Sequence, residues 1–222
     1  MKVVVKVCGN RSAGDLIAAA ESGADLLGII FADAWRRVPM DYASKMVSEF
    51  RERVDSPPPV VGVFVDQSAE EVNRIADVVG LDMVQLHGAE DMSFWSEIER
   101  PLVIARRLNQ GLSAAEAAEL LAPIHAYVEQ RNSLALVEPL VEGQPGGAGV
   151  SLNTDLAASL VRCFPFLLAG GLNPKNVAEI IAAVRPWGVD VSSGVETGQV
   201  KDHAKVGQFV NAAKRAGTSI AR

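Results

Sequence analysis

The chain has few cysteines and no concentration of basic residues. Its two cysteines, Cys8 and Cys163, lie far apart and outside any Cys-x-x-Cys or Cys/His ligand spacing, which argues against a disulfide framework and a zinc site. No basic run is present, and the formal net charge is -6 at pH 7. This charge balance argues against nucleic acid as a partner, although local positive charge can still hold a small phosphorylated ligand.

Long apolar stretches are also absent. No uninterrupted apolar stretch in the 222 residues is long enough to span a bilayer, so we expect no membrane partner. The first residues enter a strand-like run without the apolar segment of a signal peptide, and we expect a cytoplasmic protein, either a monomer or a homodimer. Hydrophobic residues make up 49% of the chain, as in ordinary globular proteins, and the length fits one core. We therefore expect residues 1–222 to form a single domain.

Eight short apolar runs alternate with amphipathic segments along the whole chain. Runs of this kind, without strict apolar/polar alternation, are typical of parallel strands buried on both faces. The segment from Val72 to Val79 illustrates the intervening pattern, with apolar side chains at the helical spacing i, i+3, i+4 and i+7. The eight runs are Val3–Val7, Leu26–Phe31, Val60–Val65, Met83–Leu86, Leu102–Ala105, Leu134–Val137, Phe166–Ala169 and Val189–Val191.

Eight strand–helix units in this length predict the α/β class and a single-domain (β/α)8 TIM barrel. The rival is a doubly wound open sheet, which would favour a Gly-x-Gly-x-x-Gly turn after the first strand. The turn from Cys8 to Gly14 lacks that pattern. Helix starts are marked by Ser113 with Glu116, which have capping-box spacing, and by Asn173-Pro174, a cap before proline.

Two turns of small residues follow the last two runs. The first is Gly170-Gly171, and the second is Ser192-Ser193-Gly194. Small residues let a ligand approach the backbone, and helix N-termini present unpaired N–H groups. Either turn alone could simply end a strand, but in a barrel the loops after strands seven and eight usually bind phosphate. We therefore predict that a small phosphorylated substrate binds here.

Residues that follow the strands of a barrel meet at one rim, so two strand ends are candidates for catalysis. Cys8 ends the first strand beside Lys6 and could be a reactive thiolate, although an isolated cysteine is more often a small buried hydrophobe. Glu138 ends the sixth strand and would face Cys8 across the mouth. A carboxyl and a thiol opposed in this way form an acid/base pair for moving protons between neighbouring atoms.

Three further positions are candidates for substrate binding. Arg36, beside Trp35, could hold a carboxylate through a two-point fork, although a solvated charge pair also explains its pairing with Arg37. His87, at the end of the fourth strand, fits a rim hydrogen bond or a half-buried structural role equally well. Asp190 lies in the eighth strand, and its direction stays open.

Five segments carry a resemblance to a known family. They read Lys6-Val7-Cys8-Gly9, Gly62-Val63-Phe64-Val65, Val84-Gln85-Leu86-His87-Gly88, Leu168-Ala169-Gly170-Gly171-Leu172-Asn173-Pro174 and Val189-Asp190-Val191-Ser192-Ser193-Gly194-Val195-Glu196. Together they resemble the phosphoribosylanthranilate isomerases of tryptophan biosynthesis. The resemblance implies a single-domain barrel without a cofactor. It also implies an Amadori rearrangement, in which an acid protonates the furanose ring oxygen of N-(5-phosphoribosyl)anthranilate and a base then removes the C2 proton.

The same resemblance implies roles for particular residues. It makes Cys8 the general base and Glu138 the general acid, and it places the anthranilate carboxylate on Arg36. The phosphate is expected near Gly147, Gly149, Gly170, Gly171, Ser192, Ser193 and Gly194.

Several rim positions differ from the pattern that the resemblance implies. The family usually has aspartate where this chain has Glu138, and threonine where it has Ala148; the segments Asn10–Ser12 and Ala34–Arg36 also differ. Two alternatives therefore stay beside the isomerase: a paralogue that acts on another N-phosphoribosyl arylamine, and a phosphosugar-binding barrel that has lost turnover.

Overall fold

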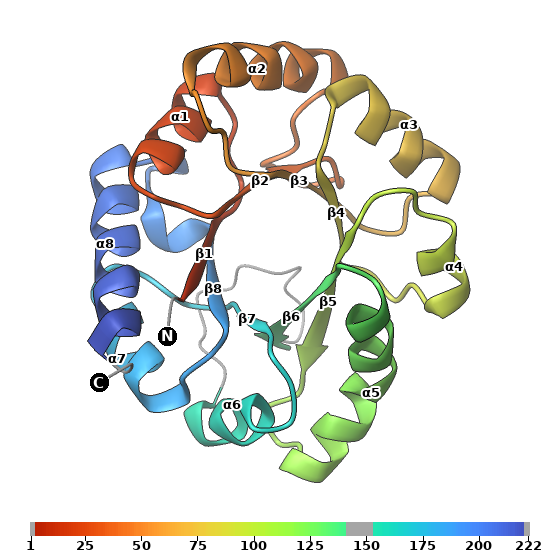
Figure 1. Ribbon diagram of the computed structural model, residues 1–222, viewed down its shortest axis with the longest axis vertical. Coiled ribbons are helices and arrows are strands. Elements are labelled where there is room, and N and C mark those ends of the chain that lie inside the picture. Colours follow the sequence, from red (N-terminus) through yellow and green to blue (C-terminus); the bar gives the residue numbers. More distant parts are fainter. Residues whose placement is uncertain (1–2, 141–152, 220–222) are drawn as a thin grey trace.

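A computed structural model of the chain describes residues 3–140 and 153–219. Eight parallel strands close into a barrel in their order along the chain, and helices α1 to α8 surround it (Figure 1). The predicted TIM barrel is therefore confirmed, and the open sheet is excluded. The strands are β1 (Val4–Val7), β2 (Leu26–Ile30), β3 (Val60–Phe64), β4 (Met83–Leu86), β5 (Leu102–Leu108), β6 (Leu134–Pro139), β7 (Leu167–Leu168) and β8 (Gly188–Val191).

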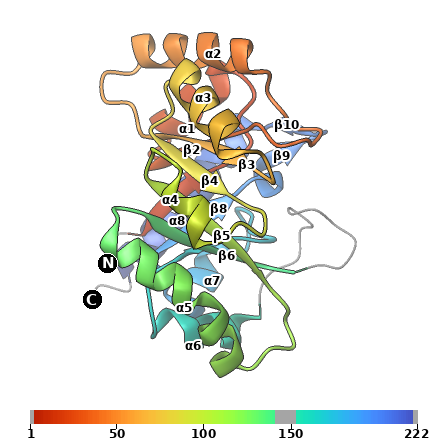
Figure 2. The ribbon, with the colours of Figure 1, turned by 90° about the vertical axis from the view of Figure 1, so that its right-hand side faces the viewer.

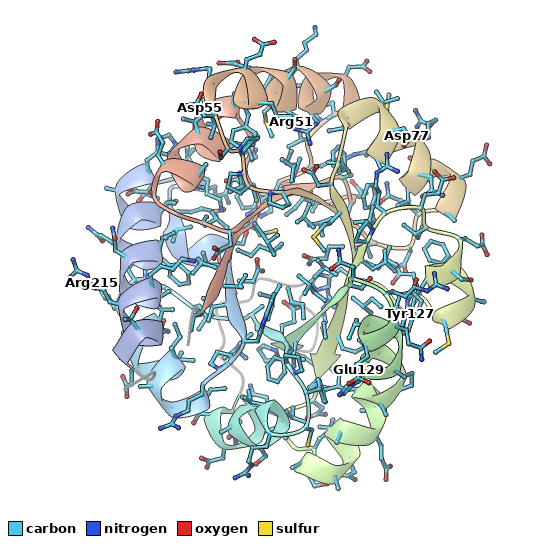
Figure 3. All side chains as sticks on the ribbon, in the orientation of Figure 1. Arg51, Asp55, Asp77, Tyr127, Glu129 and Arg215 are labelled. Atoms are coloured by element: carbon cyan, nitrogen blue, oxygen red, sulfur yellow. The ribbon has the colours of Figure 1, made fainter. Side chains whose placement is uncertain are left out.

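The helices lie outside the strand ring, and the larger apolar core fills the space between the two layers. Figure 3 shows the charged side chains of Arg51, Asp77 and Arg215 on the outer helices. Within the described ranges, no helix is long and apolar enough to cross a membrane. The helices are α1 (Ala13–Glu21), α2 (Met40–Arg53), α3 (Ala69–Val79), α4 (Met92–Ser96), α5 (Ala114–Gln130), α6 (Thr154–Val161), α7 (Val177–Val184) and α8 (His203–Ser219).

A second, smaller apolar cluster lies inside the strand ring, apart from the larger core. It includes Leu136, and Val4 packs against it. Successive strand residues point to opposite faces, so residues two apart share a face. Lys6 and Cys8 therefore follow Val4 on the inner side of β1, and Glu138 follows Leu136 on the inner side of β6. Each inner face thus changes from apolar side chains to polar ones toward the carboxyl end of the strand.

Local sequence signals set several element boundaries. The capping box of Ser113 and Glu116 is present at the start of α5, as predicted. The expected cap at Asn173-Pro174 is wrong, because α7 begins at Val177 behind Asn176. The side chain of Asn173 instead accepts a hydrogen bond from the backbone N–H of Lys175, and both asparagine amides donate to the Gly171 carbonyl. These asparagines therefore shape the turn after β7.

A short hairpin after β8 was not expected from the sequence. Following the 3-10 helix η1 (Ser193–Val195), β9 (Glu196–Thr197) pairs antiparallel with β10 (Val200–Lys201). The two residues between them, Gly198 and Gln199, have φ angles of 57° and 64°, as tight hairpin turns require. Figure 2 places the hairpin beside the segment that joins β2 to α2.

Candidate active site

Cys8 lies at the carboxyl end of β1, where its side chain is buried. Lys6, two residues earlier on the same face, is fully buried, and its Nζ lies 2.8 Å from Oδ1 of Asp190. The parallel register places Lys6 directly opposite Asp190 on β8, which explains the ion pair. Asp190, whose direction the sequence left open, therefore points to the same inner side as Lys6 and Cys8.

The environment of Cys8 favours the thiol form. Burial raises the pKa of the Cys8 thiol above its ordinary value, and the nearby Lys6 ammonium offsets only part of this effect. Asp190 raises the pKa of Cys8 further through its negative charge. Lys6 itself has a raised pKa: burial opposes its charge, but Asp190 and Cys8 outweigh burial. The buried ammonium of Lys6 therefore stays charged beside the Cys8 thiol.

Glu138 lies on β6, and two neighbours converge on one of its oxygens. Nε2 of His87 lies 2.7 Å from Oε1, and Nε of Arg107 lies 2.9 Å from the same atom. Nδ1 of His87 lies 3.1 Å from Nε2 of Gln85, two residues earlier on the inner face of β4. The structure thus brings the predicted residues His87 and Glu138 together and adds Arg107 and Gln85 to them.

These contacts set the charge of Glu138. Burial by itself would raise the pKa of the Glu138 carboxyl, but the hydrogen bonds and charges of His87 and Arg107 outweigh it and hold the pKa below its ordinary value. Glu138 is therefore a carboxylate at neutral pH in this structure. The inner rim carries a thiol on β1 and a carboxylate on β6, three steps apart around the barrel.

Arg36, in the segment between β2 and α2, is held by the hairpin that follows β8. Its Nε donates to Oε1 of Glu196 at 2.9 Å, and its Nη2 donates to Oε2 at 2.8 Å. Lys201 pairs with the same carboxylate, with Nζ 2.8 Å from Oε1. The guanidinium also stacks on Trp35, with its carbon 4.0 Å from the ring centroid. Arg36 is thus fixed at the rim by residues far away in the sequence.

The two turns predicted to bind phosphate lie against each other. Gly170 and Gly171 have φ angles of 96° and 60°. A Cβ atom on Gly194 would collide with the carbonyl oxygen of Leu172, so the second turn packs directly on the first. The hydroxyl of Ser192 is buried without a hydrogen-bond partner in the described part of the chain. Gly147 and Gly149, the other predicted phosphate residues, lie outside the described residues.

Sequence reasoning missed three charged residues of this rim: Arg107, Glu196 and Lys201. Arg107 has a signal in the sequence, since it lies two and four residues after the inward-facing Ala105 and Val103. Glu196 ends the last segment that carries the family resemblance, but no local signal indicates its contact with Arg36. Lys201 has no signal at all, because only the hairpin brings these two residues against the loop after β2.

Comparison with known proteins decides the family. The family model described as N-(5'phosphoribosyl)anthranilate (PRA) isomerase matches residues 5–212. This chain belongs to the phosphoribosylanthranilate isomerase family. An N-(5'-phosphoribosyl)anthranilate isomerase from Roseiflexus sp. (strain RS-1) is 41% identical over 215 residues, which cover 96% of this chain and 98% of the relative. The corresponding isomerase from Pseudomonas fluorescens (strain Pf0-1) is 39% identical over 211 residues, covering 94% and 97%.

Solved phosphoribosylanthranilate isomerases share the fold. The crystal structure of the enzyme from Thermotoga maritima is 30% identical and has a TM-score of 0.79, covering 96% of this chain and 99% of that one. Another isomerase structure holds reduced 1-(o-carboxyphenylamino)-1-deoxyribulose 5-phosphate; it is 29% identical, with a TM-score of 0.75 and the same coverage of both chains. The expected departure of the rim from the family is not borne out, since family model and relatives span it almost completely.

Proposed function

We propose that this chain isomerises N-(5-phosphoribosyl)anthranilate to 1-(o-carboxyphenylamino)-1-deoxyribulose 5-phosphate, with Glu138 as general acid and Cys8 as general base. Family membership supports the reaction. The observation that supports the roles is the placement of both groups on the inner rim, each beside partners that influence its protonation. Perturbed protonation of paired groups at a barrel mouth is characteristic of acid–base sites.

The two groups would act in succession. Protonated Glu138 gives its proton to the furanose ring oxygen, the C1–O bond breaks, and the nitrogen lone pair forms the C=N bond of a Schiff base. The Cys8 thiolate then removes the C2 proton, and the released electrons form the C1–C2 double bond of an enol while the nitrogen regains its lone pair. Ketonisation of the enol gives the product.

The remaining rim residues bind the two ends of the substrate. The phosphate would lie against the packed turns at Gly171 and Gly194, where glycine has no side chain to stand between a ligand and the backbone N–H groups. Arg36 lies close to Ser192, since a Cβ atom on Gly9 would touch both side chains, and its guanidinium suits a planar carboxylate. We expect His87 and Asp190 to act by holding Glu138 and Lys6 in place. A monomer and a homodimer both stay compatible with this site, and so does the expected cytoplasmic location.

The proposal is tested by adding the protein to phosphoribosylanthranilate made in situ from anthranilate and phosphoribosyl pyrophosphate. Loss of the fluorescence of the arylamine substrate at a rate proportional to protein concentration is the expected result. Binding of the reduced product analogue without any turnover would contradict the activity and favour a binding protein instead.

A further inference from the structure

Arg36, Glu196 and Lys201 form a small buried ion network at the rim. The exposed fractions of their side chains are 14%, 8% and 2%. Lys201 also donates from Nζ to the backbone carbonyl of Ser192 at 2.9 Å. Each member therefore has fixed partners, and the network joins the segment after β2 to the hairpin after β8. Buried ion pairs rarely add stability compared with apolar packing, so stability alone does not account for this network.

Among residues 3–140 and 153–219, only Glu196 accepts hydrogen bonds from the Arg36 guanidinium, which leaves half of its donors for a ligand. An arginine presents five N–H donors, and Glu196 takes the side edge formed by Nε and Nη2. The other edge, formed by Nη1 and the second hydrogen of Nη2, is also a planar two-point fork. Glu196 and the Trp35 ring fix the plane and rotation of the guanidinium, so this free edge has one direction.

The charges explain why Lys201 accompanies the pair. A bidentate carboxylate alone would neutralise Arg36 and leave little attraction for a substrate anion. Lys201 pairs with the same carboxylate, so with Lys201 protonated the group of one anion and two cations has a net charge of +1. Burial lowers the pKa of Lys201, and the hydrogen bond and charge of Glu196 offset part of that effect. Lys201 also lies near the catalytic cysteine, since a Cβ atom on the adjacent Gly9 would be 3.5 Å from its Nζ.

We propose that Glu196 and Lys201 are positioning residues that aim the free edge of Arg36 at the carboxylate of the arylamine substrate and keep that edge positively charged. This inference rests on the proposed function, because it assigns the ortho-carboxylate of that substrate to Arg36. Glu196 fixes the direction of the Arg36 guanidinium, and Lys201 offsets the negative charge of Glu196. The network would thereby select a carboxylated arylamine over one without the carboxylate.

The test compares two ligands by calorimetry: reduced 1-(o-carboxyphenylamino)-1-deoxyribulose 5-phosphate and the same compound without its carboxylate. The dissociation constant of the ligand without the carboxylate, divided by that of the ligand with it, measures recognition of the carboxylate alone. In Glu196→Gln and Lys201→Met we expect this ratio to fall on the order of tenfold or more. Glu196→Gln no longer fixes the direction of the Arg36 guanidinium, and Lys201→Met removes the positive charge that offsets Glu196. Binding of the ligand without a carboxylate should change little, which also reports that the variants are folded.

Two further variants separate positioning from support of the hairpin. Lys205→Met removes a lysine that donates to the backbone carbonyl of Glu196 at 2.9 Å, so it should leave the ratio as in the parent. Lys201→Arg keeps the charge and should restore most of the ratio. An unchanged ratio in Glu196→Gln, or equal losses for both ligands, would overturn the proposal. If the parent still turns over phosphoribosylanthranilate in that case, only the positioning role fails and the proposed function stands. If the parent neither turns it over nor binds either ligand, the proposed function itself fails.

Discussion

Nε2 of His87 lies 2.7 Å from Oε1 of Glu138, the group we assign as the general acid. On the other side of the imidazole, the amide nitrogen of Gln85 lies 3.1 Å from Nδ1. Nε2 of the imidazole thus faces the carboxylate, and the Gln85 amide holds the ring at its other nitrogen. Together with Arg107, this arrangement stabilises the ionised form of Glu138, whereas the reaction requires the protonated form.

The first prediction concerns the pH dependence of kcat/KM. The reactive form needs Glu138 protonated and Cys8 ionised, but the pKa of Glu138 is lowered and that of Cys8 is raised. The rate follows the product of the fraction of protonated Glu138 and the fraction of ionised Cys8. Below the pKa of Glu138 this product falls with pH because the Cys8 thiolate is lost, and above the pKa of Cys8 it falls because protonated Glu138 is lost. The profile should therefore be a bell whose acidic limb reports Glu138 and whose basic limb reports Cys8.

Replacing Arg107 tests that assignment of the limbs. Arg107→Met removes a positive charge and a hydrogen bond from Glu138, so the pKa of Glu138 should rise and the acidic limb should move to higher pH. Arg106→Met is the matched control, since the guanidinium of Arg106 donates to the carbonyls of Gly88 and Glu90 and not to Glu138. Movement of the basic limb alone in Arg107→Met would reverse the assignment.

The second prediction concerns the acid itself. Glu138→Gln keeps the size of the side chain but has no acidic proton, and kcat/KM should fall roughly 10²–10⁴-fold. Glu138→Asp draws the carboxyl back by roughly 1 Å, which should slow the reaction on the order of 10²-fold. Steady-state rates measured by substrate fluorescence provide the comparison, and full activity in Glu138→Gln would remove Glu138 from the mechanism.

The third prediction tests the phosphate turns. Gly171 has a φ angle of 60°, and a Cβ atom there would both strain the backbone and stand where phosphate should approach. Gly171→Ala should therefore weaken competitive inhibition by inorganic phosphate. Gly80→Ala is its control: Gly80 has a φ angle of 73° at the end of α3, away from the rim, and it should lose similar stability without changing phosphate inhibition. Equal inhibition of both variants and the parent would place the phosphate elsewhere.

The fourth prediction concerns the buried pair of Lys6 and Asp190. Lys6→Met leaves a largely buried carboxylate without its partner, and the free energy of unfolding in urea should fall by about 3–5 kcal/mol. Adding Asp190→Leu should recover much of that loss without restoring activity, since the counter-charge of Cys8 is still missing. Arg53→Met breaks an exposed i,i+4 pair with Glu49 and should change stability by about 1 kcal/mol or less. A Lys6→Met loss no larger than that of Arg53→Met would refute the structural part of this account.

The barrel could be predicted because its signals are local. Eight apolar runs with helical segments between them, and caps such as Ser113, determine the strands and helices from neighbouring residues. β5 extends to Leu108, beyond its expected end at Ala105, because Arg106 and Arg107 stay paired with β6. The sequence did not show this extension, since the two arginines interrupt the apolar pattern. The charged end of a strand is therefore easily mistaken for a loop.

The site could be predicted in part. Cys8, His87 and Glu138 follow directly from their places at strand ends, where the two-residue period of a strand brings them to one rim. The partners of Arg36 could not be predicted, since its contact with Glu196 joins residues 160 apart in the sequence. Likewise, the state of Glu138 depends on Arg107 and His87 from two other strands. Charges and proton positions at the rim are set by packing in space.

The most direct test of the central claim is the rate at which the Cys8→Ser protein converts phosphoribosylanthranilate in a single turnover, compared with the parent. A serine hydroxyl keeps the size of the side chain, but it cannot ionise to a useful extent near neutral pH. We predict a fall of roughly 10²–10⁴-fold, with binding of the reduced product analogue nearly unchanged. A Cys8→Ser protein that keeps more than about a tenth of the parent rate would contradict the account.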